Sequence, residues 1–129
     1  MMKKLLILLF SLFFLSSPSV FAENFIYHCN LDTYYKNSEA ESWQNKYIRF
    51  TFTANNNNIS IYDHEYNFTY PDKNLIIYSE NPQLVAIYQD SSQFSSLVID
   101  KPNNFGTYTI SYSNGNFAGQ FGMGRCYLQ

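Results

Sequence analysis

Apolar and polar residues alternate along most of the chain after residue 22, and a period of two residues is typical of half-buried β-strands. The clearest example is residues 47–53, in which Ile48, Phe50 and Phe52 alternate with Tyr, Arg and Thr residues. We expect strands in nine segments: 25–29, 47–53, 59–63, 66–70, 75–79, 84–89, 97–100, 107–113 and 117–128. Segments 75–79 and 84–89 are apolar on both faces, which predicts a central position in the sheet.

Turn-forming residues separate these segments. Asn, Asp, Ser, Gly and Pro favour turns because they adopt the required backbone angles or bond to nearby backbone groups. We expect loops or turns at residues 55–58, 71–74 and 80–82, and at Asn114-Gly115, the dipeptide that two-residue β-hairpins prefer. Gly119, Gly122 and Gly124 interrupt the last segment and predict a bulge or bend there.

Residues 32–45 do not show the strand pattern. Ser38 and Glu41 have the spacing of a capping box, which predicts a short helix over residues 39–45 that carries Trp43. An irregular loop is the alternative, and the pattern does not decide between the two.

Eight or nine short antiparallel strands in about 100 residues predict an all-β domain, either a small barrel or a sandwich of about eight strands. We favour the barrel. An outer-membrane barrel does not fit, because its strands need about 9–11 residues to cross a bilayer. We therefore expect a single β domain over residues 23–129.

The first 22 residues have the pattern of a cleavable signal peptide. Lys3 and Lys4 precede an apolar run over residues 5–15, and Val20 and Ala22 are the small residues expected before a cleavage site. The run is shorter than the ~20 residues that span a bilayer. We expect cleavage after Ala22 and a periplasmic or secreted product without stable membrane insertion; the alternative is an uncleaved anchor.

Two cysteines, Cys29 and Cys126, lie near the two ends of the predicted domain. Exported proteins meet an oxidising compartment in which two such thiols usually pair, so we predict a Cys29–Cys126 disulfide. A free buried pair and intermolecular bonds are the alternatives. Two cysteines alone do not form a metal site, and no motif indicates a cofactor.

Charge excludes some classes of partner. Residues 23–129 contain 6 basic and 10 acidic side chains, a net charge of −4. Because no basic patch or polybasic stretch is present, nucleic-acid binding is disfavoured.

The densest polar cluster is Asp63, His64 and Glu65. In a turn these three side chains would converge on a cation or form a hydrolytic site, whereas a solvated turn is the alternative. His28 lies next to Cys29 on the opposite strand face, so adjacency does not support a Cys–His nucleophile pair. No catalytic motif is found, and we expect a protein that is not an enzyme.

Tyr47, Arg49 and Tyr62 form a candidate binding face. Tyr47 and Tyr62 lie opposite the aliphatic faces of their strands, and Tyr and Arg dominate binding hot spots. Such a face would bind a protein, a peptide or a sugar. Strand propensity alone is the other explanation of these tyrosines.

The positions of Tyr27-His28-Cys29 in the first strand and Gly124-Arg125-Cys126 in the last resemble those in small periplasmic lysozyme inhibitors. This resemblance implies an exported β-barrel with an inhibitor-like binding role. The Ser-Gly…Tyr loop of those inhibitors is not found here. The Gly-x-Trp expected of lipocalins is also missing, since Trp43 follows Glu41-Ser42.

Three functional hypotheses follow. The leading one is a non-enzymatic binding module that acts on a protein or polymer of the bacterial envelope. The second is a structural or assembly component that adds a strand at an exposed sheet edge. The third is a small hydrolase with its site at residues 63–65.

Overall fold

The computed structural model of the protein describes residues 24–36, 38, 40–69, 74–112 and 119–129. The predicted signal peptide and most of the predicted turns at 71–74 and 114–115 lie outside these residues. The elements are β1 (Phe25–Lys36), β2 (Gln44–Asn55), β3 (Asn58–Asp63), β4 (Phe68–Thr69), β5 (Leu75–Ser79), β6 (Gln83–Gln89), β7 (Gln93–Asp100), the 3-10 helix η1 (Lys101–Asn103), β8 (Phe105–Tyr112) and β9 (Gly119–Leu128). Within the described part of the chain, no helix has the length and apolar character needed to cross a bilayer.

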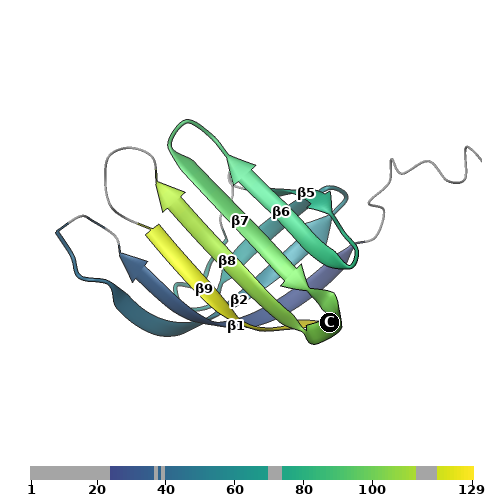
Figure 1. Cartoon of the computed structure of the whole chain (residues 1–129), viewed down its shortest axis with the longest axis horizontal. Helices are drawn as coiled ribbons and strands as arrows, with labels where there is room; N and C mark the ends of the chain where they lie inside the picture. The colour runs from purple at the N-terminus through teal and green to yellow at the C-terminus, as the bar shows by residue number, and fades with distance from the viewer. Residues whose placement is uncertain (1–23, 37, 39, 70–73, 113–118) are drawn as a thin grey trace, which may run out of the picture.

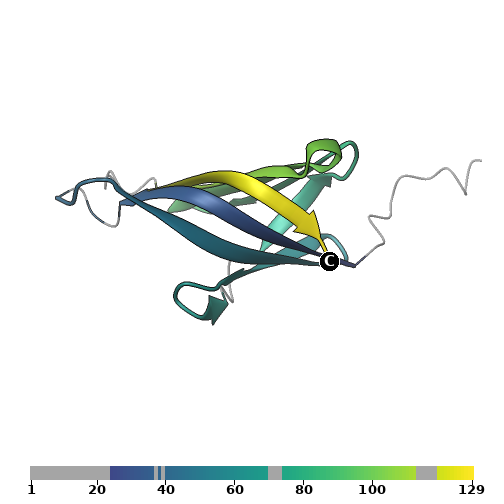
Figure 2. The ribbon, with the colours of Figure 1, turned by 90° about the horizontal axis from the view of Figure 1, so that it is seen from below.

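Eight of the strands form a closed antiparallel barrel. The pairing order is β2-β1-β9-β8-β7-β6-β5-β3, and the additional pairing of β2 with β3 closes the ring. β7 and β8 cross in front of β2 (Figure 1), and β9 lies between β8 and β1 (Figure 2). The short strand β4 pairs only with Tyr62 and Asp63 at the end of β3. The prediction of a barrel is confirmed.

The interior of the barrel is filled by the inward side of each strand. The rings of Phe50 and Phe52 each contact Tyr108 edge-on, with centroid distances of 5.3 and 5.4 Å, and aliphatic side chains surround them. In an eight-stranded barrel the interior is just wide enough for side chains to fill. The alternation seen in the sequence therefore separates a packed core from an outer face.

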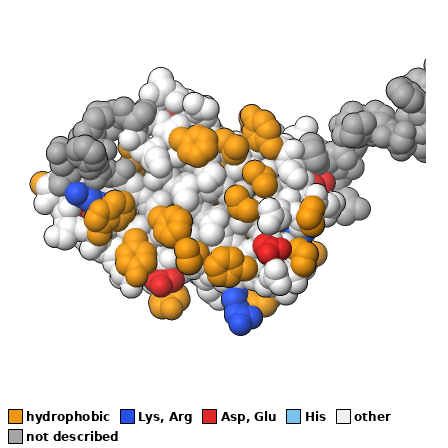
Figure 3. Space-filling view, viewed as in Figure 1, with side chains coloured by type: hydrophobic (Ala, Val, Ile, Leu, Met, Phe, Trp, Pro, Cys, Tyr) orange, Lys and Arg blue, Asp and Glu red, His pale blue; other side chains and the backbone are white. Residues whose placement is uncertain are grey.

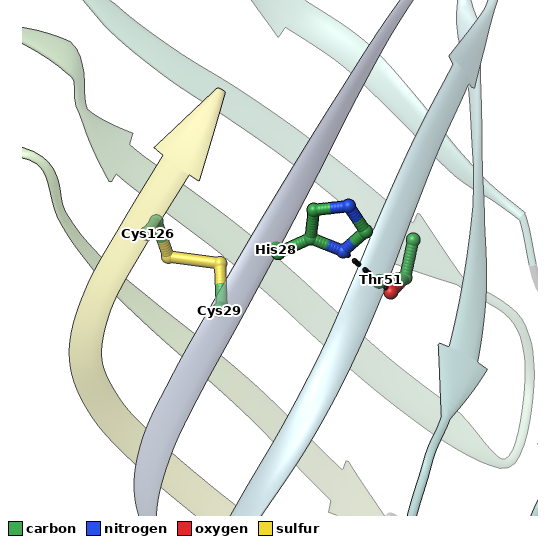
Figure 4. Close-up of a disulfide and its surroundings, with 4 residues drawn as sticks. All are labelled: His28, Cys29, Thr51 and Cys126. Carbon is green, nitrogen blue, oxygen red and sulfur yellow. Dashed lines mark hydrogen bonds between the residues drawn. A yellow bond between two sulfur atoms is a disulfide. The ribbon is translucent and has the colours of Figure 1, made fainter. Parts of the chain in front are cut away.

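The predicted disulfide between Cys29 and Cys126 is present, and it joins β1 to β9 (Figure 4). The two residues lie directly opposite each other in the β1–β9 ladder, with Cα atoms 4.1 Å apart, and both are fully buried. Gly106 on the neighbouring strand leaves room for the bond, because a Cβ at this position would lie 2.5 Å from Sγ of Cys126.

The helix considered for residues 39–45 is wrong for the residues that the structure describes there. β1 continues through Lys36 and β2 begins at Gln44, with register pairs from Asp32–Tyr47 to Tyr35–Gln44. Extension of the hairpin satisfies the backbone groups of these residues with ladder hydrogen bonds. Their outward side chains are polar or aromatic, so the sequence carries little apolar alternation.

Two further expectations are corrected by barrel closure. Of the bulge or bend predicted in β9, the bulge is wrong, because the strand pairs with β1 and β8 without a register shift. Its glycines instead allow close approach, since a Cβ on Gly124 would lie 2.1 Å from the carbonyl oxygen of Asn30. Segments 75–79 and 84–89 are not doubly buried, and Ile76 and Tyr78 are 50% and 66% exposed. Every strand of a closed barrel has one outer face.

The segment predicted as a strand at residues 66–70 is a strand only in part. Of its described residues, 66–69, the last two form β4, and the first two form a turn in which Asn67 adopts a left-handed conformation with φ 52°. Asn56 does the same with φ 59° in the tight turn between β2 and β3, where the loop was expected. Asn adopts this region more readily than most residues do.

Candidate functional site

Because side chains fill the interior, the surfaces open to a ligand are the outer face and the ends of the barrel. A cavity of about 380 Å³ lies where the two ends of the domain meet, and its lining includes Phe25, Ile26, Thr53 and Gln129. The backbone N–H of Gln129 donates to the carbonyl of Ile26 over 2.8 Å. The side chains of this lining offer amide and hydroxyl groups but no acid or base.

A second feature lies on the outer face, where both histidines of the sequence converge on one hydroxyl group. Oγ1 of Thr51 lies 2.9 Å from Nδ1 of His28 and 2.7 Å from Nε2 of His64. His28 extends from β1 toward Thr51 on β2 (Figure 4). Thr51 sits directly opposite His28 on one side and Tyr62 on the other, so three strands contribute to the cluster.

The hydrogen bonds of this cluster have a defined direction when both rings are neutral. Nε2 of His28 lies 2.5 Å from Oε1 of Gln129, an acceptor, and must therefore carry the proton. Nδ1 of His28 then accepts from the Thr51 hydroxyl. That hydroxyl oxygen in turn accepts from Nε2–H of His64. Protonation of His64 leaves this pattern unchanged.

The electrostatic surroundings favour the neutral form of His64. Desolvation by its neighbours lowers the pKa of His64, and the positive charge of Arg49 and the proximity of His28 lower it further. The carboxylate of Asp63 acts weakly in the opposite direction. The ring of Tyr62 packs edge-on against His64 with centroids 4.6 Å apart.

Beside the histidines, both arginines of the sequence occupy one cross-strand row. Asn30 on β1 is directly opposite Arg49 on β2 and directly opposite Arg125 on β9, and all three side chains are exposed. The backbone N–H of His64 donates to the carbonyl of Arg49, which extends the row to a fourth residue. We call the six residues of these two rows the basic face: His28, Asn30, Arg49, Thr51, His64 and Arg125.

The candidate binding residues predicted from the sequence lie on or beside this face. Arg49 belongs to it, Tyr47 is 75% exposed on the same side of β2, and Tyr62 is half-buried across from Thr51. The hydroxyl of Tyr62 donates to the side chain of Asn67.

The polar cluster at residues 63–65 does not converge. Asp63 is 2% exposed and accepts backbone N–H bonds from Glu65 and Tyr66, while burial raises the pKa of its carboxyl group. Glu65 forms an ion pair with Lys46, and His64 turns away to Thr51. Among the described residues, no group of three or more His, Cys, Asp or Glu side chains is arranged to hold a metal ion.

Four residues of the basic face were not predicted from the sequence as site residues: His28, Asn30, Thr51 and Arg125. The signal for part of this arrangement was present: if Cys29 pairs directly with Cys126 in an antiparallel ladder, then Asn30 must lie opposite Arg125. The pairing of β2 with β3, which brings His64 to Thr51, had no such marker.

Comparison of the chain with protein-family models, curated proteins and solved structures gave no match.

Proposed function

We propose that the mature protein is an exported binding module without enzymatic activity, and that it holds a component of the bacterial envelope through the outer face of β1, β2 and β9. The observation that carries this proposal is the gathering of both arginines and both histidines in two adjacent rows of that face. Exposed aromatic side chains flank them, and aromatic residues and Arg are enriched in binding surfaces.

Apolar exposure on β9 supports the same face. Its outward residues include Phe121, Met123 and Tyr127, which are 41%, 41% and 46% exposed. The side of the molecule formed by β7, β8 and β9 carries many hydrophobic and few charged side chains (Figure 3). Here exposed apolar side chains lie beside arginines whose side chains make no ion pair among the described residues. Such a combination is typical of a surface that binds a partner.

The two other hypotheses have less support. Strand addition needs a free sheet edge, and among the described residues the closed ring leaves only short edges, at β4 and at the start of β2, which pairs with β3 from Phe50 to Asn55. A hydrolase at residues 63–65 needs converging side chains, and those of Asp63, His64 and Glu65 make separate contacts.

Site-specific photo-crosslinking in cells tests the proposal. Tyr127 on β9 and Tyr78 on β5 are both exposed tyrosines, and their strands lie on opposite sides of the ring. We expect Tyr127→p-benzoylphenylalanine to capture an envelope component that Tyr78→p-benzoylphenylalanine does not. Equal capture at both positions, or none at Tyr127, would contradict the proposal. The double Cys→Ala form provides the control for dependence on the fold.

A further inference from the structure

We propose that the basic face binds a phosphate group attached to a sugar, with Arg49 and Arg125 holding the phosphate from two sides across Asn30. This inference rests on the proposed function and names the chemistry of its ligand. It starts from the spacing of the two arginines. Arg49 and Arg125 lie on the two strands that flank β1, and neighbouring strands are about 4.8 Å apart. The Cα atoms of the two arginines are therefore about 10 Å apart.

The donors in this row are not used within the domain. Among the described residues, the side chains of Arg49, Asn30 and Arg125 make no hydrogen bond or ion pair. The ion pair observed in the same set of residues joins Lys46 to Glu65 instead. Two guanidinium groups and an amide therefore present N–H donors to the same exposed region, and the sequence places no other arginine elsewhere.

Local charge favours an anion despite the acidic net charge of the domain. The row places the positive charges of Arg49 and Arg125 on either side of Asn30, with His64 in the same row and His28 in the adjacent one. The neighbouring carboxylates are directed elsewhere: Asp63 faces inward, Glu65 is paired, and Asp32 in the next row accepts from the side chain of Asn45 over 2.5 Å. A planar guanidinium fork matches the oxygens of carboxylates and phosphates.

The arrangement favours phosphate over carboxylate. A carboxylate has two oxygens in one plane and one edge for a bidentate arginine, whereas a tetrahedral phosphate presents oxygens in several directions. Two arginines that approach from opposite strands can then each make a paired contact. Asn30, which lies between them, is placed to donate to a remaining oxygen.

The surroundings of the row favour a sugar over a lipid as the carrier. Tyr47 and Tyr127 border it with exposed rings on which a sugar can stack. A bilayer surface covers a wider area than one phosphate and would also contact the carboxylate of Asp32 in the next row. Anionic headgroups repel such a charge.

The test is an NMR titration of the mature, oxidised protein at constant ionic strength with four probes: glucose 1-phosphate, inorganic phosphate, acetate and glucose. We expect glucose 1-phosphate to bind with a Kd on the order of 1 mM and to shift the side-chain signals of Asn30 and both arginines. Inorganic phosphate should bind several-fold more weakly, and acetate and glucose more weakly still.

Single substitutions locate the site. Arg49→Gln and Arg125→Gln should each weaken binding about tenfold or more, and Arg→Lys at either position should restore only part of the affinity. Lys36→Gln is the matched control, because it removes the same charge about 20 Å away along β1. All of these side chains lie outside the core, and circular dichroism verifies that each variant is folded.

Four outcomes would overturn the inference. They are the absence of saturable shifts with glucose 1-phosphate, equal binding of acetate, equal binding of inorganic phosphate, and equal weakening by Lys36→Gln. Binding to vesicles of phosphatidylglycerol, without binding of glucose 1-phosphate, would assign the face to lipid instead. If crosslinking at Tyr127 persisted while glucose 1-phosphate failed to bind, the proposed function would stand and only this ligand would be wrong.

Discussion

Loss of the Cys29–Cys126 disulfide is the perturbation whose size follows most directly from the structure. The bond joins residues 97 positions apart and so closes nearly the whole domain. The entropy of the unfolded chain that such a loop removes corresponds to about 4.7 kcal/mol, which is an upper guide. Domains of this size are typically stable by about 5–15 kcal/mol, so the bond supplies a large share.

Three forms of the predicted domain, residues 23–129, separate the cross-link from its packing: the oxidised protein, the reduced protein and the Cys29→Ala/Cys126→Ala variant. Reduction removes the cross-link but keeps both sulfur atoms, so we expect a loss of about 3–5 kcal/mol. The double variant also leaves a small buried void, which should cost about 1–3 kcal/mol more. Both cysteines are fully buried beside Gly106, where little can move in to fill the space.

The assay is urea unfolding followed by circular dichroism, with thermal unfolding as a second measurement. A loss of about 4 kcal/mol corresponds to a fall in melting temperature of roughly 15–25 °C. A difference of less than about 1 kcal/mol between the free energies of unfolding of the oxidised and reduced proteins would refute the entropic account. For a loop of this length, that account predicts a much larger difference.

Three further predictions concern the core and the outer face. Gly106→Ala should cost about 1–3 kcal/mol in urea unfolding, because its Cβ would lie 2.5 Å from Sγ of Cys126, and the cost should shrink in the double Cys→Ala background. Asp63→Ala should cost about 1–3 kcal/mol, since two backbone N–H groups lose their acceptor. Burial raises the pKa of Asp63 in the folded protein above its value in the unfolded chain. The free energy of unfolding of the wild type should therefore fall, relative to that of Asp63→Asn, as the pH rises from the unfolded pKa through the folded one. A difference between the two proteins that does not change with pH would contradict this. Arg49→Gln should raise the pKa of His64, measured from its ring-proton NMR shifts, and an unchanged titration would show that the charge of Arg49 does not reach the ring.

Much of the architecture was predictable from local patterns. Alternation identified most of the strands and assigned Phe50 and Phe52 to the interior, because side chains on a strand point to opposite faces in turn. The same alternation placed Arg49 and Tyr47 outside. The positions of Cys29 and Cys126 predicted the disulfide.

Where the pattern was weak, the prediction was wrong or undecided. Residues 32–45 carry few inward apolar side chains, so nothing local indicated that Asp32 and Tyr47 continue the same hairpin. The bulge expected in the last strand came from its glycines, but Gly122 and Gly124 serve instead to bring neighbouring strands close. In residues 32–45 and in the last strand, the structure was decided by backbone hydrogen bonds between strands. Such pairing leaves little trace in the pattern of side chains along the sequence.

Where the alternation is clear, as in residues 47–53, the sequence by itself therefore determined which residues face inward and which face outward, because that depends only on the local period of the chain. Tertiary structure alone decided which outward residues are neighbours. His28 and Thr51 come from two strands and His64 from the turn after β3, and Arg49 meets Asn30 only in one register of β1 against β2. Register is set by ladder hydrogen bonds and by the packing of the whole core, so a site assembled across strands appears only when the barrel closes.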